Sequence, residues 1–277
     1  MHKFIVFLFM LLFTAAVYAQ EDEKKEPELG WSEDVIFNLS FTQNSFDNWN
    51  QGGDNSWAWQ TDLLPKFIYR QENYEWENLG KFSYGKSKVA DQDARKASDE
   101  IKLESSYTYK LYEQINPYVA VKAQTQFTAG YEYSDTSRVE ISNFMDPGYL
   151  QESIGAGWTP NEQFRTRLGV AFKQTFTDKY AGRYALGETF RSEIGAESVT
   201  DLELKMSETI TYTGRLSLFS NMKRFDEIDA DWDNLFKGKL TDIINVTFTF
   251  RLFYDRDVSA KRQLKQTLAV GLSFDLI

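Results

Sequence analysis

The sequence lacks residues on which several kinds of chemistry depend. Its 277 residues include no cysteine and a single histidine, His2. The absence of cysteine excludes disulfide scaffolds, thiol nucleophiles, cysteine-based zinc sites and an N-terminal lipidated cysteine. A histidine base is missing once the first residues are removed, and no spacing in the chain points to a Ser-Lys or carboxylate-only mechanism. We therefore expect no enzymatic activity, no catalytic or metal site and no cofactor.

The chain also lacks a basic face. It contains 31 Lys and Arg against 41 Asp and Glu, which gives a formal charge of −10. Charges of both signs are scattered along the chain, whereas proteins that grip phosphates cluster their basic residues. We therefore expect no nucleic-acid partner.

Only the N-terminus carries a long apolar run. Residues 1–19 have the pattern of a secretory signal peptide, with Lys3 before the apolar stretch and a cleavage site after Ala19. A membrane-anchoring helix is disfavoured because the run is shorter than the ~20 residues that a spanning helix needs. Residues 20–30 then form a short acidic periplasmic tail, and 31–277 form the folded domain.

What the chain has in abundance is aromatic residues, at 16%, arranged in long alternating patterns. Trp57, Leu63 and Tyr69 share one face of an extended segment, whereas Asp62 and Lys66 share the other. This period of two predicts strands over 31–43, 56–70, 74–87, 100–110, 116–130, 148–159, 163–176, 189–200, 208–221, 228–239, 243–254 and 263–276. Residues 197–207 also fit an extended turn. The connections alternate between short and long, with long ones near 44–55, 88–99, 131–147 and 177–188.

This rhythm predicts an all-β fold: a closed antiparallel transmembrane β-barrel of about twelve strands, with short periplasmic turns and longer extracellular loops. The competing fold is a soluble periplasmic β-sandwich or lipocalin-like barrel. A barrel of about twelve strands is too wide for side chains to fill an apolar interior, so its apolar face belongs outside. Aromatic residues also gather near strand ends, as in the two interfacial girdles of membrane barrels, although β-propensity alone would also favour them in strands.

Several short strings are similar to one known family. They are residues 48–57 (NWNQGGDNSW), 95–101 (RKASDEI), 141–150 (ISNFMDPGYL), 218–222 (LFSNM), 228–235 (IDADWDNL) and 253–257 (FYDRD). Together they resemble a family of Gram-negative outer-membrane barrels that is catalogued only as a domain of unknown function. The resemblance implies the barrel fold and the cell outer membrane of a Gram-negative bacterium, but no activity and no functional residue. One departure is the last residue, Ile277, where such barrels commonly end on an aromatic residue.

If the aromatic face contacts lipid, the polar face lines the lumen, and it carries both charge signs. The candidate lumen-lining residues are Asp62, Lys66, Lys102, Glu104, Lys122, Arg165, Arg167, Arg215, Asp229, Asp231, Asp233 and Arg251. Such charges serve a narrow channel for small polar solutes, which is the favoured function. They also serve ion-pair networks that close the lumen of a structural or assembly-associated barrel. The sequence leaves both functions open.

Asp229, Asp231 and Asp233 have the spacing that begins a calcium loop. The pattern then fails, because Asn234 stands where the loop needs glycine and Leu240 where it needs glutamate. We therefore expect these carboxylates to line one face of a strand.

A third hypothesis is a surface receptor that acts through its long loops. The candidate contacts are Trp49, Asn50, Gly52, Gly53, Asn55, Pro147 and Tyr149, which combine aromatic and adaptable polar residues. Exposed aromatics near a membrane also serve as interfacial anchors, and glycines there serve turns. The expected partners are outer-membrane lipids, the barrel-assembly machinery during insertion and a small polar solute.

Overall fold

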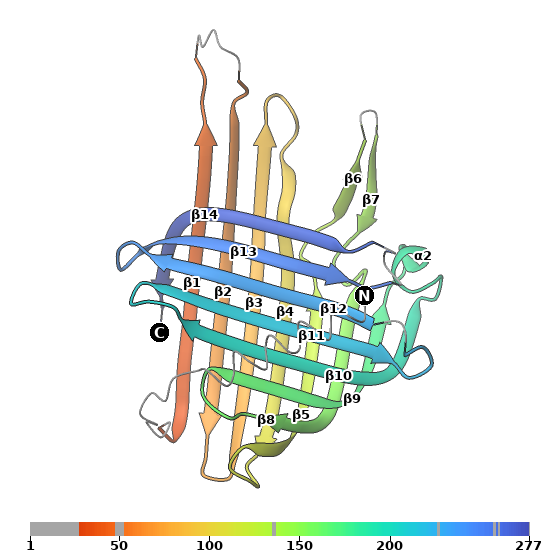
Figure 1. Cartoon of the computed structure of the whole chain (residues 1–277). Helices are drawn as coiled ribbons and strands as arrows, with labels where there is room; N and C mark the ends of the chain where they lie inside the picture. Colours follow the sequence, from red (N-terminus) through yellow and green to blue (C-terminus); the bar gives the residue numbers. More distant parts are fainter. Residues whose placement is uncertain are drawn as a thin grey trace.

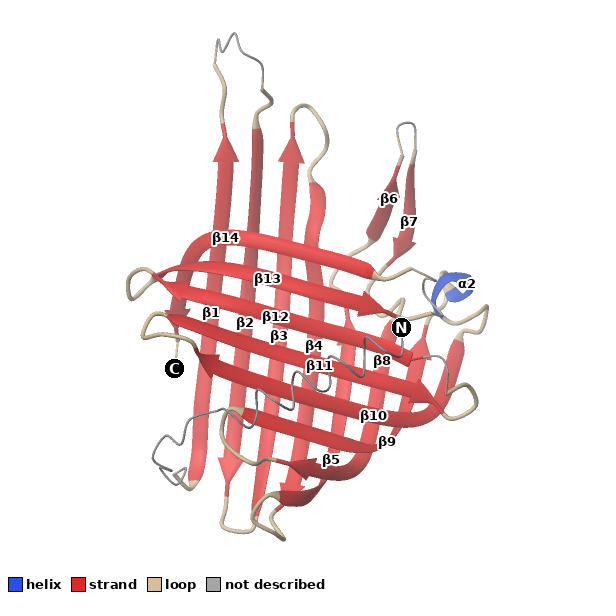
Figure 2. Cartoon of the chain, in the orientation of Figure 1, coloured by secondary structure: helices blue, strands red, loops and turns tan. Residues whose placement is uncertain are grey.

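The computed structural model describes residues 28–47, 53–134, 137–225, 228–256, 259 and 261–276. The expected signal peptide and most of the acidic tail lie outside these ranges. Twelve long strands form one closed antiparallel barrel (Figures 1 and 2), which confirms the expected fold. The strands are β1 (Gly30–Asn44), β2 (Ser56–Arg70), β3 (Tyr74–Val89), β4 (Arg95–Tyr109), β5 (Ile115–Thr125), β8 (Gly148–Trp158), β9 (Phe164–Phe176), β10 (Phe190–Lys205), β11 (Ile210–Asn221), β12 (Ile228–Lys239), β13 (Ile244–Tyr254) and β14 (Gln263–Asp275).

Each barrel strand pairs with its neighbours in the chain, and β1 pairs with β14 to close the barrel, with Leu39 opposite Leu272. The connection between β5 and β8 contains a separate hairpin of β6 (Gly130–Tyr133) and β7 (Arg138–Ser142). The connection between β9 and β10 contains the short helix α2 (Ala181–Tyr184). The hairpin extends at the same end as the β1–β2 and β3–β4 connections (Figure 1). We call this end the loop end, and the opposite end the turn end. Within the described ranges, no helix is long and apolar enough to cross a membrane.

Most strand boundaries agree with the sequence pattern within two residues, but the strand expected over 116–130 is too long. β5 ends at Thr125. Beyond it, Asp99 of β4 accepts hydrogen bonds from the backbone N–H groups of Phe127, at 2.6 Å, and Thr128, at 3.0 Å. These contacts turn the chain out of the barrel wall, and the alternation in the sequence does not reveal them.

One further expectation is corrected, and one alternative that the sequence left open is decided. The long loop expected over 88–99 is short, because β3 and β4 continue as a paired hairpin in which Ser87 lies opposite Arg95. The ambiguous segment 197–207 is strand as far as Lys205, which pairs with Thr211 of β11. The loop expected over 131–147 contains most of the β6–β7 hairpin.

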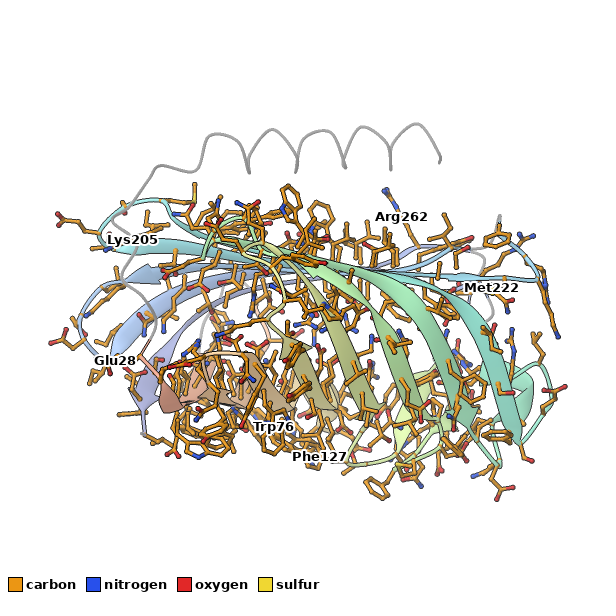
Figure 3. All side chains as sticks on the ribbon, turned by 90° about the horizontal axis from the view of Figure 1, so that it is seen from below. Glu28, Trp76, Phe127, Lys205, Met222 and Arg262 are labelled. Atoms are coloured by element: carbon orange, nitrogen blue, oxygen red, sulfur yellow. The ribbon has the colours of Figure 1, made fainter. Side chains whose placement is uncertain are left out.

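Aromatic residues form clusters at both ends of the outer face. At the turn end, the ring of Trp31 lies 5.0 Å from that of Tyr69 and 6.1 Å from that of Trp76, and Figure 3 places Trp76 on the outside of the wall. At the loop end, the ring centres of Trp59 and Tyr84 lie 5.9 Å apart. The distribution is that of two girdles flanking an apolar band, which is the arrangement of membrane-spanning barrels.

Candidate functional site

The inner wall of the barrel carries the charged residues. Side chains alternate along each strand, and the cross-strand register keeps one face continuous around the barrel. By this register all the candidate lumen-lining residues project inward, and side chains occupy the space between the two walls (Figure 3).

A first group of ion pairs crosses the lumen. Lys102 of β4 lies 3.2 Å from a carboxylate oxygen of Asp231 and 3.3 Å from one of Asp233, both on β12. In the closed strand order, five strands separate β4 from β12 in either direction. The two strands are therefore opposite each other, and the pair bridges the barrel from wall to wall.

Arg251 of β13 is the centre of this group. Its Nε and Nη2 donate to the two carboxylate oxygens of Asp231, each at 2.8 Å, and its Nη1 donates to Glu100 of β4 at 2.7 Å. Glu100 also lies 2.9 Å from Lys81 and 3.2 Å from Lys102. Two acids on facing walls thus share cations, and the two walls are held together. We call Lys81, Glu100, Lys102, Asp231, Asp233 and Arg251 the central network.

A second group lies one layer closer to the turn end. Glu104 of β4 accepts a hydrogen bond from Arg215 of β11, at 2.5 Å, and pairs with Arg167 of β9 at 2.7 Å. Arg215 also lies 3.3 Å from Asp201. Arg165 pairs with Glu77 at 3.3 Å, while Lys66 approaches the same carboxylate at 3.9 Å.

A third group lies toward the loop end. Lys173 of β9 donates to Asp229 at 2.8 Å and to Asp255 at 3.1 Å. Glu197 is buried and accepts hydrogen bonds from Gln151 and, at 3.4 Å, from the Tyr118 hydroxyl. Asp62 lies apart from these groups. Its carboxylate accepts a hydrogen bond from the Ser83 hydroxyl at 2.5 Å and another from the side-chain amide of Gln60.

Among the described residues, one cavity of the lumen lies on the turn side of the central network and another on its loop side. The cavity on the turn side has a volume of about 440 Å³ and is lined by Glu75, Glu77, Lys110, Arg165 and Arg167 among others. The cavity on the loop side has a volume of about 90 Å³. Side chains from opposite walls, above all those of the central network, lie between the two cavities.

Sequence reasoning did not single out Glu100, Glu197, Asp201 and Asp255. Glu100 lies on the same face of β4 as Lys102 and Glu104, so the alternation could have identified it as a lumen-lining residue. Glu197 and Asp201 lie in the segment whose secondary structure was ambiguous. Asp255 follows the last residue of β13, where alternation carries no information.

The candidate loop contacts that the structure describes do not form one exposed surface. Gly53 and Asn55 are exposed, and Asn55 accepts a hydrogen bond from the backbone of Phe46 at 2.7 Å. Pro147, by contrast, is buried, and Tyr149 is a residue of β8 that lines the cavity on the loop side. Both were expected at the loop surface and are corrected: Pro147 is covered by other residues, and the alternation of β8 places Tyr149 on the inner face. Trp49, Asn50 and Gly52 lie outside the described residues.

The described part of the chain contains no group of three or more acids that could hold a metal ion. The three aspartates of β12 instead face lysine and arginine: Lys173 for Asp229, and Lys102 with Arg251 for the other two. Their negative charges are therefore paired with cations inside the lumen.

At the loop end, hydrogen bonds join the connection between β5 and β8 to the connection between β9 and β10. Asp146 accepts hydrogen bonds from the Thr177 hydroxyl and from the backbone N–H groups of Asp178 and Lys179, both at 3.0 Å. Burial opposes its ionisation, but these hydrogen bonds outweigh burial and hold the pKa of Asp146 below its ordinary value. Glu140 of β7 similarly accepts from the Tyr180 hydroxyl.

Comparison with known proteins gives a family match for one part of the chain. Residues 41–131 match a family described as a protein of unknown function (DUF3078), so the resemblance expected from the sequence is confirmed there. The search of curated proteins gives no match.

Several solved barrels are similar to this chain. The translocator domain of the autotransporter NalP from Neisseria meningitidis has 9% identity and a TM-score of 0.39, covering 98% of this chain and 95% of its own. The NanC porin has 11% identity and a TM-score of 0.41, covering 88% and 100%. An outer-membrane channel from Pseudomonas putida F1 has 9% identity and a TM-score of 0.41, covering 92% and 98%.

Proposed function

We propose that the protein is a non-enzymatic, integral outer-membrane barrel of a Gram-negative cell that provides a narrow path for small polar solutes. The observation that carries the proposal is the lumen itself. Two cavities, each lined in part by charged side chains, lie on either side of a constriction built from strand side chains, above all Lys102, Asp231 and Arg251. Rings of charge at a constriction select among small solutes by sign and size.

The outer face supports a membrane location. Ile154, Leu168 and Leu268 project outward and are 62%, 65% and 70% exposed. So many large apolar side chains around a whole barrel would be unfavourable in water and are favourable against lipid. Outer-membrane lipids are the proposed partners of this face. A cleaved signal peptide and the barrel-assembly machinery would deliver and insert the chain.

The constriction can open without movement of the backbone. Lysine and arginine side chains have several rotatable bonds, so a change of rotamer can move their charged ends aside. A charged solute that passes would take the place of one partner in an ion pair, so the remaining charge of the wall stays neutralised. The proposed channel therefore conducts weakly and with marked charge selectivity.

The second candidate function is a closed scaffold. The bridging of opposite walls favours it, since Lys102 of β4 pairs with Asp231 of β12 and Arg251 of β13 pairs with Glu100 of β4. Networks of this kind stiffen a lumen that transports nothing.

The deciding experiment is single-channel conductance of the refolded chain in a planar lipid bilayer with a salt gradient. A conducting protein should show discrete steps with reproducible selectivity. The variant D229N/D231N/D233N removes three negative charges from one luminal strand and should shift selectivity toward anions.

The matched control is D54N/D91N/D93N, in which three exposed loop carboxylates are neutralised instead. It should leave the selectivity close to that of the parent chain. Silence from protein proven to be folded would refute the channel and leave the closed scaffold. Unchanged selectivity in the luminal variant would remove β12 from the conducting path.

A further inference from the structure

One lysine in the lumen differs from the others. Lys81, Lys102 and Lys173 each have a carboxylate oxygen within 3.3 Å. Lys122 of β5 lines the cavity on the loop side, but among the described residues it forms no hydrogen bond and no ion pair within 4.0 Å. An ammonium group removed from bulk water without a partner is unfavourable, so this position favours the arrival of an anion.

The nearby carboxylates do not fill this role. Glu104 and Glu197 attract Lys122 from a distance, but both are engaged elsewhere. Glu104 is held by Arg215 at 2.5 Å and by Arg167 at 2.7 Å. Glu197 accepts hydrogen bonds from other residues of the wall. The three N–H donors of Lys122 therefore stay available to the cavity.

Two further polar groups with unused hydrogen-bonding capacity lie beside Lys122. Gln124 follows it on the inner face of β5, and Tyr149 lies directly opposite Gln124 on β8. Both line the same cavity, and within the described part of the chain neither side chain has a hydrogen-bonding partner. Ammonium, amide and phenol donors thus converge from two adjacent strands.

The opposite side of this cavity is partly apolar. Phe219 of β11 and Phe253 of β13 line it, together with acids that already have cationic partners: Asp229 and Asp255 share Lys173. The other two acids of the lining also have cationic partners, Asp231 in Arg251 at 2.8 Å and Glu197 in Arg167 at 3.6 Å. Because Asp229 and Asp255 share one lysine, an anion would be held at the Lys122 side of the cavity, away from β12. A ligand with one anionic end and a short hydrocarbon body fits these walls, and a volume of about 90 Å³ limits it to a few carbon atoms.

We propose that Lys122, Gln124 and Tyr149 form a binding site for the carboxylate of a small organic acid, with the hydrocarbon part against Phe219 and Phe253. The inference deepens the proposed channel and rests on it: the site is where a solute pauses on the loop side before the central network. A planar carboxylate offers two acceptor oxygens to donors arriving from two strands, which a spherical halide cannot do.

The test is calorimetric titration of the refolded full-length barrel in detergent with sodium butyrate at constant ionic strength. Saturable binding is expected for the parent chain. The variant K122Q should weaken binding about tenfold to a hundredfold, because a hydrogen bond to a charged group is lost. Y149F should weaken it by a smaller factor, and K122R should restore most of the affinity.

The matched control is K265Q. Lys265 is also a lysine of the inner wall, but it donates to Ser98 at 3.3 Å, lines neither cavity and has no carboxylate partner within 4.0 Å in the described part of the chain. Its loss should leave butyrate binding unchanged. Each variant is checked for the gel-mobility shift of a folded barrel, and Y149F keeps the test decisive if K122Q does not fold.

Three results would overturn the site: no binding to the parent chain, equal binding to K122Q, or competition by chloride as strong as by butyrate. A barrel that conducts but does not bind butyrate refutes this inference alone. A barrel that binds butyrate but never conducts refutes the channel alone.

Discussion

The central network predicts a specific loss of stability when Arg251 is replaced by methionine. Methionine keeps much of the side-chain volume but removes the guanidinium. The variant loses two hydrogen bonds to Asp231 at 2.8 Å and one to Glu100 at 2.7 Å. Each bond joins two charged groups, and these are the stronger class of hydrogen bond in proteins.

The size of the effect follows from what remains in place. Three charge-assisted hydrogen bonds at about 1.5–3 kcal/mol each set an upper limit near 9 kcal/mol. Lys102 stays 3.2 Å from both Asp231 and Glu100, so neither acid is left without a cation. The side chains of Arg251 and Asp231 are 23% and 22% exposed, so water can replace part of the loss. We expect a loss of about 3 kcal/mol, the lower end for breaking a buried pair.

The assay is equilibrium urea unfolding of the barrel in lipid vesicles, followed by tryptophan fluorescence. The control is R262M, which removes an exposed arginine of the loop before β14 and should change stability by less than about 0.5 kcal/mol. The double variant D231N/R251M should recover part of the loss, since it leaves two cations, Lys81 and Lys102, against two acids, Glu100 and Asp233. If the constriction is also the barrier to ions, R251M should raise single-channel conductance.

A loss below about 1 kcal/mol in R251M would refute the reasoning. It would mean that the contacts across the lumen are no stronger than surface ion pairs and that the opposite walls are not held together by them.

Further outcomes follow from the loop end, the inner wall and the fold. The pKa of Asp146 is lower in the folded chain than in the unfolded chain, so its contribution to the loop end is present above about pH 4 and is lost at lower pH; loop proteolysis should increase there, and D146N should remove this dependence. In G169A the new Cβ would lie 2.6 Å from the Tyr118 hydroxyl, so we expect a loss of about 1–3 kcal/mol in urea unfolding, whereas G182A, with open space around it, should cost far less. The folded barrel should migrate faster in gels before boiling than after, and unchanged mobility would contradict a closed barrel.

The strands follow from the sequence because their signal is local. Alternation over a dozen residues records which face of each strand is apolar, and this pattern gave β2 with both its ends. The pattern failed where distant residues determine the end of a strand. At the end of β5, Asp99 accepts hydrogen bonds from the backbone N–H groups of Phe127 and Thr128, which follow it by 28 and 29 residues.

The partners in the lumen could not be read in this way. The alternation assigned Lys102 and Asp231 to the inner face, yet 129 residues separate them. Their contact depends on how many strands close the barrel and on how far each strand is offset from the next. Those quantities are set by the whole sheet, since each register contributes to the position of every later strand.

By itself, then, the sequence determined the aromatic outer face, the charged inner face and the order of the strands, because each depends on residues within one strand or one turn. Only the tertiary structure decided that β4 faces β12, that Tyr149 belongs to the lumen and that Lys122 has no partner there among the described residues. Ion pairs across the lumen form only when the sheet closes. Closure brings together residues that are far apart in the sequence, and no local pattern relates their positions.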